Sequence, residues 1–312
     1  MKAAQYNRYG GPEVIEIKNV QNPIPKKGQV LVEVHAASLN PFDYRLRLGY
    51  MKENIPLDFP FTIGGDYSGV VTDLGEDVSE FKIGDEIYGQ ALVLIGASGA
   101  IAEFTAANAE NSALKPENVD FIQAASLPLV GSSVIQALEE HIKLKSGDKI
   151  LIHGGAGGIG HIAVQLAKHL GAYVATTAGG DDIEFVKSFG ADEAIDYKTQ
   201  KFEELLHDFD AVFDTVGGET VERSFKVLRK GGVIVSMLGQ PNPDLAKEQG
   251  ITSIGQNTKI TSERLKRLGE LVDNGAIKPH VDKVFSLEKT KEAFEYLESG
   301  HPKGKVVVKI RA

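Results

Sequence analysis

A glycine-rich stretch at residues 154–160 has the residue types and spacing that bind phosphate groups. It lies between a short apolar segment, 149–153, and a segment with helical periodicity, 160–170. In this G-x-G-x-x-G pattern, glycine lets the chain turn tightly and brings backbone N–H groups toward a pyrophosphate, which the helix N-terminus also attracts. We therefore predict a dinucleotide site, with a tight strand-to-helix turn as the alternative. The predicted binding residues are Gly155, Ala156, Gly157, Gly158, Ile159 and Gly160.

The choice of cofactor depends on the tip of the next strand, about 20 residues further on, where an acidic residue would bind the 2′-hydroxyl of NAD. That strand is expected to end near Thr177, which we predict to bind the cofactor. It has no Asp or Glu at its tip, which leaves room for a 2′-phosphate and favours NADPH. Asp181 and Asp182 follow closely and would repel a phosphate. Lys198, beside Tyr197, would compensate for this repulsion. The alternative for the two aspartates and for Lys198 is ordinary charge on the protein surface.

Two further pairs of residues close the ends of consecutive predicted strands, 211–216 and 233–238. These pairs are Val216 with Gly217, and Leu238 with Gly239. The carboxyl ends of parallel strands at a switch point are where α/β sheets bind ligands. Glycine there would let the ribose of a cofactor approach, and the alternative is an ordinary turn between strand and helix.

The composition excludes several other chemistries. The 312 residues include no cysteine, so disulfides, thiolate catalysis and cysteine-ligated zinc or iron–sulfur sites are ruled out. The formal net charge is −9, with no run of basic residues, so we expect no nucleic-acid partner. No apolar run approaches the roughly 18 residues of a membrane helix, and the first residues lack the pattern of a signal peptide. We therefore expect a cytoplasmic protein without a membrane partner.

Two regions of different periodicity must position these groups. Residues 29–36 alternate between apolar and polar side chains, as a half-buried strand does. Further short strands, separated by glycine and proline turns, predict a partly open β-barrel; they are 2–6, 14–17, 69–74 and 86–90. From residue 149 onward, strands alternate with helices, which predicts a doubly wound parallel sheet.

Five segments resemble those of the medium-chain dehydrogenases/reductases, and more narrowly of the zinc-independent quinone oxidoreductase branch that includes zeta-crystallin. They are FKIGDEIYG (81–89), GGAGGIG (154–160), DTVGG (214–218), GGVIV (231–235) and GKVVV (304–308). The resemblance extends from residue 2 to residue 310. It implies a GroES-like catalytic domain built from both ends of the chain, a Rossmann domain between them, and an active-site cleft where the domains meet.

The implied fold class is α/β, with a GroES-like, partly open β-barrel domain and a doubly wound, parallel-sheet Rossmann domain. We place the first part of the catalytic domain at residues 1–122 and the Rossmann domain at 123–260. The chain then returns to the catalytic domain over 261–312.

The chain departs from zinc-dependent relatives at their metal ligands. Those relatives carry a catalytic cysteine before the first helix and a Gly-His-Glu after it. This chain has AASLN at 36–40 and GGD at 64–66 instead, and none of its eight histidines pair at metal-ligand spacing. We therefore expect no bound metal, and we expect hydrogen bonds and positioning to replace the metal in catalysis.

The segment 40–50 replaces the zinc-ligand region and supplies the implied catalytic residues. By resemblance, Asn40 reaches the nicotinamide ribose or a substrate oxygen. Asp43, Tyr44 and Tyr50 would orient the substrate or donate a proton. The alternatives are a helix N-terminal cap or a salt bridge with a nearby arginine for Asp43, and core packing for the tyrosines.

Ser133 lies in a predicted helical region, 121–141, which we expect to be interrupted at Pro128 and Gly131. The family places a turn that faces the cofactor at this point. Ser133 would then donate a hydrogen bond to the nicotinamide or the substrate, and the alternative is a helix cap.

Tyr197 resembles the aromatic residue that family members place beside the adenine ribose, and the alternative is surface packing.

The resemblance implies an NADPH-dependent oxidoreductase that delivers hydride to a quinone or an α,β-unsaturated carbonyl compound. An enoyl-thioester reductase is the nearest alternative enzyme, but the short connection 239–255 leaves little extra structure for its long substrate. A non-catalytic NADPH-binding sensor or crystallin-like protein is the alternative from another class, because a fold does not determine a function.

Residues 251–256 are expected to form the edge strand of the parallel sheet. The segment is β-prone and uncharged, without the lysine or proline that protects an exposed edge, and family members commonly pair this strand across a two-fold axis. We therefore expect a homodimer. The alternative is that the helix predicted at 262–274 covers the edge and leaves a monomer.

Overall fold

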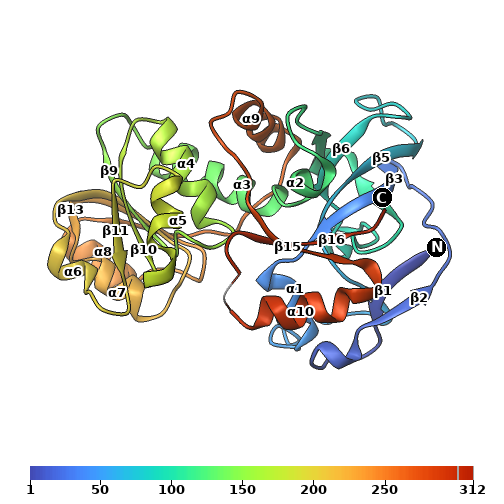
Figure 1. The fold of residues 1–312 in the computed structure, drawn as a ribbon, viewed down its shortest axis with the longest axis horizontal. Helices are drawn as coiled ribbons and strands as arrows, with labels where there is room; N and C mark the ends of the chain where they lie inside the picture. Colours follow the sequence, from blue (N-terminus) through green and yellow to red (C-terminus); the bar gives the residue numbers. More distant parts are fainter. Residues whose placement is uncertain (301, 312) are drawn as a thin grey trace. The chain divides into compact units, whose positions relative to one another are not determined.

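The computed structural model describes residues 1–300 and 302–311, which form two compact units (Figure 1). The first unit contains Met1–Leu129, Ile260–Asp273 and the chain from Pro279 onward. The second unit contains Val130–Lys259 and Asn274–Lys278. The chain therefore leaves the first unit after Leu129, returns to it at Ile260 and crosses to the second unit once more for the short segment Asn274–Lys278. The first unit is thus built from both ends of the chain, as the family resemblance implies.

Mostly antiparallel strands build the first unit. Its larger sheet has the order β15 (Val281–Ser286), β16 (Lys305–Lys309), β3 (Gln29–Ser38), β5 (Asp66–Leu74), β6 (Glu86–Gln90) and β8 (Ser112–Leu114), and β7 (Phe104–Asn108) also pairs with β3. A smaller sheet has the order β2 (Glu16–Asn19), β1 (Lys2–Tyr6) and β4 (Phe61–Thr62). Alternate residues of β3, such as Val30, Val32 and Val34, are fully buried, because successive side chains of a strand point to opposite faces.

Helices pack on these sheets. They are α1 (Pro41–Arg47), α2 (Phe121–Ala125), α9 (Ser262–Asp273) and α10 (Thr290–Glu298), with short helical turns η1 (Pro12–Val14), η2 (Val93–Ile95), η3 (Ala109–Asn111) and η6 (Leu287–Lys289). α2 contacts β3 and β5, so residues 123–129 group with the first unit, whereas the sequence pattern places them in the Rossmann domain. α9 packs on β8.

The second unit is a parallel sheet. Its strand order is β11 (Glu193–Asp196), β10 (Tyr173–Ala178), β9 (Lys149–His153), β12 (Phe209–Asp214), β13 (Leu228–Ser236) and β14 (Thr252–Gly255), and all neighbours run parallel. Counted from β9, this order is 3-2-1-4-5-6, the order of the Rossmann fold, with its switch point between β9 and β12. The predicted fold class is confirmed.

The helices of the second unit follow the strands in sequence (Figure 1). α3 (Pro128–Ile135) enters this unit and continues as the π-helix η4 (Gln136–Ile142); the others are α4 (Gly160–His169), η5 (Gly180–Asp182), α5 (Ile183–Ser188), α6 (Phe202–Leu205), α7 (Glu219–Ser224) and α8 (Pro243–Gln249). α4 contacts β9 and β10. The predicted apolar face of α4, including Ile162 and Leu166, is fully buried.

Two predicted details of the second unit are wrong. α3 is not interrupted at Gly131: Pro128 is its first residue, where the missing N–H of proline costs the helix no hydrogen bond. β12 and β13 end at Asp214 and Ser236, before Val216 and Leu238. The buried Asp214 carboxylate accepts the backbone N–H groups that follow it and so turns the chain away from the ladder.

Candidate functional site

The glycine-rich loop at 154–159 joins β9 to the N-terminus of α4, at the switch point of the parallel sheet. Gly155 in this loop and Gly160 at the start of α4 leave no room for a side chain. A Cβ atom on Gly155 would lie 2.2 Å from Thr176 Oγ1, and a Cβ atom on Gly160 would lie 2.1 Å from the Gly154 carbonyl oxygen. These glycines allow the loop to lie close to the neighbouring strand and to the start of α4.

Gly157 differs because its Cα faces open space. Among the described residues, a Cβ atom there would meet only the Gly154 carbonyl oxygen, at 3.4 Å. The loop itself therefore does not need a glycine at this position, whereas a ligand that approaches the backbone closely does. The loop fits a dinucleotide pyrophosphate, and the N-terminus of α4 supplies partial positive charge.

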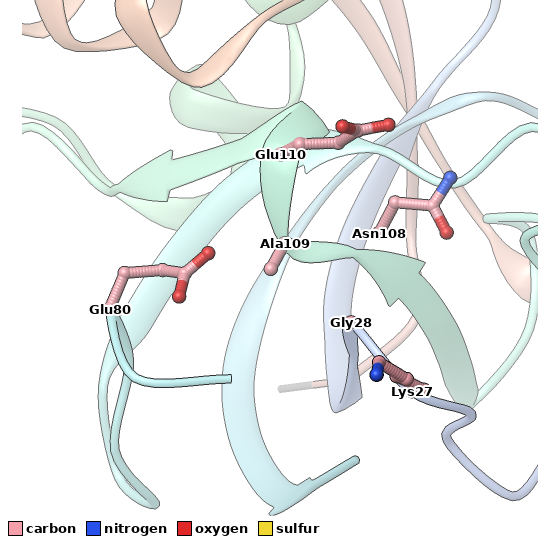
Figure 2. A pocket seen from close by; sticks show the side chains of 6 residues that line it. All are labelled: Lys27, Gly28, Glu80, Asn108, Ala109 and Glu110. Atoms are coloured by element: carbon pink, nitrogen blue, oxygen red, sulfur yellow. The ribbon is translucent and has the colours of Figure 1, made fainter. Parts of the chain in front are cut away.

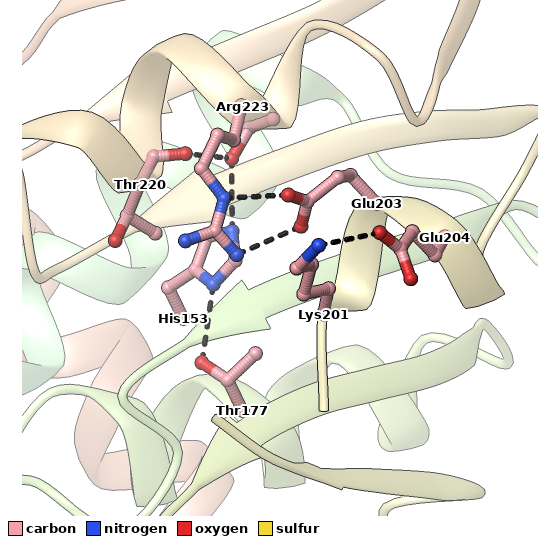
Figure 3. A network of polar contacts seen from close by, with 8 residues as sticks. His153, Thr177, Lys201, Glu203, Glu204, Thr220 and Arg223 are labelled. Atoms are coloured by element: carbon pink, nitrogen blue, oxygen red, sulfur yellow. Dashed lines mark hydrogen bonds and ion pairs between the residues drawn. The ribbon is translucent and has the colours of Figure 1, made fainter. Parts of the chain in front are cut away.

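A buried hydrogen-bond network supports the loop. His153, the last residue of β9, points its Nδ1 toward Thr177 Oγ1 (Figure 3), at 3.1 Å. Its Nε2 lies 2.9 Å from Ser224 Oγ. Ser224 gives its own proton to the Thr220 carbonyl oxygen, so it accepts the Nε2–H of His153, and Thr177 donates to Nδ1. Burial, aided by the nearby Arg223 charge, lowers the pKa of His153 to about 3, so the imidazole is neutral.

Thr177, which we predict to bind the cofactor, belongs to this support. Its Oγ1 lies 3.3 Å from the backbone N of Gly154, whose N–H it accepts, and it donates to His153. The residue is buried. Its hydroxyl group is therefore used within the protein, and a direct contact with a cofactor stays a prediction.

Lys198 follows the end of β11, and its side chain reaches Gly179 at the carboxyl end of the neighbouring strand β10. Its Nζ and Oδ2 of Asp182 are each 3.7 Å from the position that a Cβ atom of Gly179 would take. The backbone N–H of Lys198 donates to Asp196 Oδ1 at 3.0 Å, and the neighbouring Tyr197 is 59% exposed. This end of the strand therefore presents an ammonium group, carboxylates and an exposed aromatic ring close together.

The turns after β12 and β13 lie against each other. A Cβ atom at Gly217 would be 2.8 Å from Cβ of Leu238, and Gly217 has a φ of +80°, a conformation that favours glycine. Val216 and Leu238 are 51% and 45% exposed. The structure thus brings these predicted residues together, with Gly239 next to Leu238, and leaves two apolar side chains exposed beyond the strand ends.

The helical region is interrupted before Pro128, as predicted, but Ser133 lies inside α3, so the predicted break at Gly131 and the alternative of a helix cap are both wrong. Its Oγ is 2.8 Å from Thr258 Oγ1, and Gln256 Nε2 donates to its carbonyl oxygen at 3.0 Å. Ser133 is fully buried. The sequence did not indicate Thr258, because 125 positions separate it from Ser133.

A buried polar cluster in the first unit contains Asn40. Its Nδ2 donates to Asp66 Oδ2 at 2.9 Å, and Ser38 Oγ donates to the same oxygen at 3.3 Å. Nζ of Lys305 donates to Asn40 Oδ1 at 2.5 Å and to the Leu39 carbonyl oxygen at 2.8 Å. The end of β3 and the starts of α1, β5 and β16 therefore meet in this cluster, which we call the Asn40 cluster.

Asp43 holds the backbone of Asn40. It is the third residue of α1, and its Oδ2 accepts the Asn40 N–H at 2.8 Å in a capping box. Asp43 therefore caps the N-terminus of α1, which is one of the alternatives that the sequence left open for this residue. Arg47 does not pair with Asp43; it pairs with Glu298 and donates to the Gly10 carbonyl oxygen.

The charges of the Asn40 cluster are buried together. The pKa of Asp43 is raised to about 7, mainly by burial and in part by the Asp66 charge, although the hydrogen bond from the Asn40 N–H and the Lys305 charge both act to lower it. Burial also raises the pKa of Asp66 and lowers that of Lys305, and the attraction between these two charges opposes both shifts. Lys305 Nζ and Asp66 Oδ2 are 3.9 Å apart, so one ammonium group faces two carboxyl groups away from solvent.

The two predicted tyrosines differ in their surroundings. Tyr44 is partly buried and packs on the hydrophobic core of the first unit. This matches core packing, the alternative to a catalytic role that the sequence left open. Tyr50 is 75% exposed, so core packing is wrong for this residue.

Comparison with known proteins places this combination of units in a family. Residues 26–117 match the family model of the alcohol dehydrogenase GroES-like domain, and residues 189–308 match that of zinc-binding dehydrogenases. A 2-methylene-furan-3-one reductase of Solanum lycopersicum is 40% identical over 320 residues, which cover 99% of this chain and 79% of the relative. The chain belongs to the medium-chain dehydrogenase/reductase family.

Other relatives and solved structures agree with this family. The NADPH-dependent alkenal/one oxidoreductase, chloroplastic, of Arabidopsis thaliana is 39% identical, with coverage of 99% and 79%. The quinone oxidoreductase from Coxiella burnetii has a TM-score of 0.91 at 37% identity, over 100% of this chain and 99% of that one. The Escherichia coli quinone oxidoreductase complexed with NADPH has a TM-score of 0.88 at 27% identity, over 99% and 100%. The resemblance found in the sequence motifs is confirmed.

The residues of this family member do not fit a catalytic zinc ion. Ser38 and Asp66 stand in the segments that carry metal ligands in zinc-dependent relatives, and the ammonium group of Lys305 lies among their neighbours. A fixed ammonium group next to a carboxylate competes with a divalent cation. Within the described ranges, no group of three or more His, Asp or Glu side chains could hold a metal.

The first unit also has an open hollow, whose lining contains none of the site residues described above (Figure 2). Its volume is about 410 Å³, and it is lined by Lys27, Gly28, Glu80, Asn108, Ala109 and Glu110. The lining is mostly charged or polar and contains no aromatic side chain to cover a flat apolar ring. None of the predicted site residues is in it, so we do not assign the hollow to the reaction.

The sequence motifs do not indicate Asp66 and Lys305 as site residues. Asp66 stands in the segment that replaces a metal-ligand segment, and Lys305 stands in a family motif. A usable signal exists for Lys305, because a lysine that opens an apolar strand of three valines is a charge that the fold must bury or extend to solvent.

Proposed function

We propose that this enzyme transfers hydride from NADPH to a quinone or an α,β-unsaturated carbonyl compound, without a metal ion. The observation that carries the proposal is the loop at 154–160, where Gly157 leaves open the space that a pyrophosphate needs. The names of relatives support the substrate class: a 2-methylene-furan-3-one reductase, an NADPH-dependent alkenal/one oxidoreductase and a quinone oxidoreductase. These substrates share a conjugated carbonyl group whose oxygen gains negative charge when hydride arrives.

The second unit would bind the cofactor, which supplies the hydride when bound. We assign the pyrophosphate to the glycine-rich loop and the N-terminus of α4. We assign the 2′-phosphate to the Lys198 ammonium group, with Tyr197 beside the adenine ribose. The remaining predicted residues, at the ends of β12 and β13, would line the nicotinamide half; they are Val216, Gly217, Leu238 and Gly239.

The first unit would act on the substrate side. Asn40 is proposed to donate a hydrogen bond to the nicotinamide ribose or to a substrate oxygen, because a fixed donor stabilises negative charge as it develops. Asp43 would hold the backbone of Asn40 in place. Tyr50, whose ring is exposed, is the proposed proton donor, and Tyr44 is proposed to orient the ligands. Ser133 of the second unit is proposed to orient them as well.

NADPH oxidation measured with quinones, enones and an enoyl thioester tests this proposal. We expect turnover with quinones or enones. Turnover of the enoyl thioester alone would favour an enoyl-thioester reductase, and NADPH binding without any turnover would favour a non-catalytic role. A chelator should leave the activity unchanged, and stoichiometric zinc in the active enzyme would contradict metal independence.

We further propose that two chains associate through β14. This strand is last in the sheet order and pairs with β13; on its other edge, no strand is paired among the residues that the structure describes. Its residues, Thr252–Gly255, carry no charge. Two backbone groups of β14, the Ser253 carbonyl oxygen and the Gly255 N–H, bond to the Gln240 side chain at 3.0 and 2.9 Å. Pairing with a second β14 would satisfy the remaining backbone groups of that edge and form an isologous dimer.

The cellular location remains a proposal. In the part of the chain that the structure describes, no helix is both long and apolar enough to cross a membrane. We propose a cytoplasmic location, although the Arabidopsis thaliana relative is named as chloroplastic. Fractionation of cells followed by immunodetection would test it.

A further inference from the structure

The ammonium group of Lys305 is buried in the first unit. The residue is 4% exposed, and its Nζ donates to Asn40 Oδ1 at 2.5 Å and to the Leu39 carbonyl oxygen at 2.8 Å. The charged groups that face it are the carboxyl groups of Asp66, at 3.9 Å, and of Asp43. Burying a lysine this completely costs free energy unless its partners compensate, so its place in the cluster needs a physical explanation.

Lys305 and Asp66 together determine how the side-chain amide of Asn40 is turned. An ammonium group can only donate hydrogen bonds, and a carboxylate can only accept them. Oδ1 of Asn40 therefore faces Lys305, and Nδ2 faces Asp66 at 2.9 Å. The reverse orientation would place an NH₂ group against the ammonium and an oxygen against the carboxylate, and both contacts would be repulsive in a buried site.

This orientation determines which hydrogen-bonding group of Asn40 is left for a ligand. Nδ2 carries two hydrogens and gives one of them to Asp66. Oδ1 accepts from Lys305, and the capping box directs it toward the backbone N–H of Asp43 as well. One N–H group of Asn40 therefore remains, and it can bind an acceptor oxygen.

We propose that Lys305 is a positioning residue, which turns the Asn40 amide so that it offers a hydrogen-bond donor to an oxygen of the substrate or of the nicotinamide ribose. The inference rests on the proposed function, in which Asn40 meets a ligand. The competing explanation is charge balance, in which Lys305 only neutralises Asp66. Lys305 could then be removed together with Asp66 without loss of activity.

Three variants separate these roles: Lys305→Met, Asp66→Asn and the double variant. The double variant removes one cation and one anion, so the net charge of the Asn40 cluster does not change. Positioning predicts that it loses roughly tenfold to hundredfold in kcat/KM, because the amide that replaces the Asp66 carboxylate can donate or accept and Asn40 is no longer fixed.

The single variants complete the test. Positioning predicts that Asp66→Asn keeps a higher kcat/KM than the double variant, because Lys305 still holds Oδ1 of Asn40. Charge balance predicts the reverse pattern, an active double variant and an impaired Asp66→Asn, and this pattern would overturn the proposal. Lys305→Met alone should be impaired under both explanations, because it leaves Asp66 buried without its cation.

Lys309→Met is the matched control, because it removes a lysine from the exposed end of the same strand. It should keep the wild-type kcat/KM. Calorimetric titration of the double variant with NADPH then identifies the oxygen that Asn40 meets. A higher Kd for NADPH indicates that Asn40 meets the nicotinamide ribose. An unchanged Kd with a lower kcat indicates that Asn40 meets the substrate. Wild-type values of both Kd and kcat would overturn the proposal.

NMR of the Asn40 side-chain amide gives a readout that needs no turnover. The Nδ2 hydrogen that bonds to Asp66 should exchange slowly with solvent in the wild type and in Lys309→Met, and faster in the double variant. If the wild type reduces no quinone or enone but shows this pattern, the proposed function fails and the positioning role of Lys305 stands. Identical amide signals and exchange rates in the wild type and the double variant would overturn that role.

Discussion

His153 and Ser224 are joined by a hydrogen bond of 2.9 Å between Nε2 and Oγ that lies wholly inside the second unit. The bond connects the end of β9 to α7. The other ring nitrogen of His153 faces Thr177, whose hydroxyl accepts the N–H of Gly154. Because the ring donates on one side and accepts on the other, the network that supports the glycine-rich loop requires a neutral imidazole.

Acid should therefore weaken the fold through His153. Its pKa is lowered from 6.5 to about 3 by folding, so between these values the unfolded chain binds a proton that the folded chain does not. The contribution of His153 to the free energy of unfolding is therefore complete above pH 6.5. It falls as the pH decreases, by roughly 2 kcal/mol at pH 5. Urea unfolding at pH 7 and pH 5 should show a smaller pH effect in His153→Gln than in the wild type.

His169→Gln is the control for this experiment. His169 is an exposed residue of α4, so its replacement should keep the pH dependence of the wild type. An equal pH effect in the wild type and His153→Gln would mean that this network does not control the acid sensitivity.

Gly157→Val should abolish NADPH binding and leave the protein folded. A Cβ atom at this position meets the Gly154 carbonyl oxygen at 3.4 Å, so the fold accepts it, but the side chain fills the space of the pyrophosphate. Gly160→Ala should instead lower the Tm, because its Cβ atom would lie 2.1 Å from that oxygen. Thermal unfolding and calorimetric titration separate the two effects. If Gly157→Val retains its NADPH affinity, the loop is not the phosphate site.

The glycine-rich loop could be predicted because its pattern is local. The residues that specify the strand, the tight turn and the helix all lie within 149–170. The Asn40 cluster could not be predicted in this way. Asn40 and Lys305 are 265 positions apart, and they meet only because β16 pairs with β3. No local periodicity specifies that pairing. The ends of β12 and β13 were also misplaced, because they depend on the buried carboxylate of Asp214 and not on the apolar run.

Lys198→Gln should shift the cofactor preference toward NADH. The Lys198 ammonium group lies beside Gly179 at the carboxyl end of β10, where it would bind the 2′-phosphate of NADPH. Losing a hydrogen bond to a charged group should lower kcat/KM for NADPH by about tenfold and leave that for NADH unchanged. Lys201→Gln is the matched control, because Lys201 already pairs with Glu204. An unchanged cofactor ratio in Lys198→Gln would place the 2′-phosphate elsewhere.

Ser253→Pro should convert a dimeric protein to monomers. Ser253 lies in the middle of β14, opposite Ile234 of β13, and proline removes a backbone donor from the strand and fits poorly within a ladder. Ser253→Ala keeps that donor and should remain dimeric. Light scattering at micromolar concentration measures the mass of each form, and a monomeric wild type would contradict the dimer directly. If Ser253→Pro folds and stays dimeric, the interface must lie on a surface other than β14, because the altered strand could no longer pair with its twin.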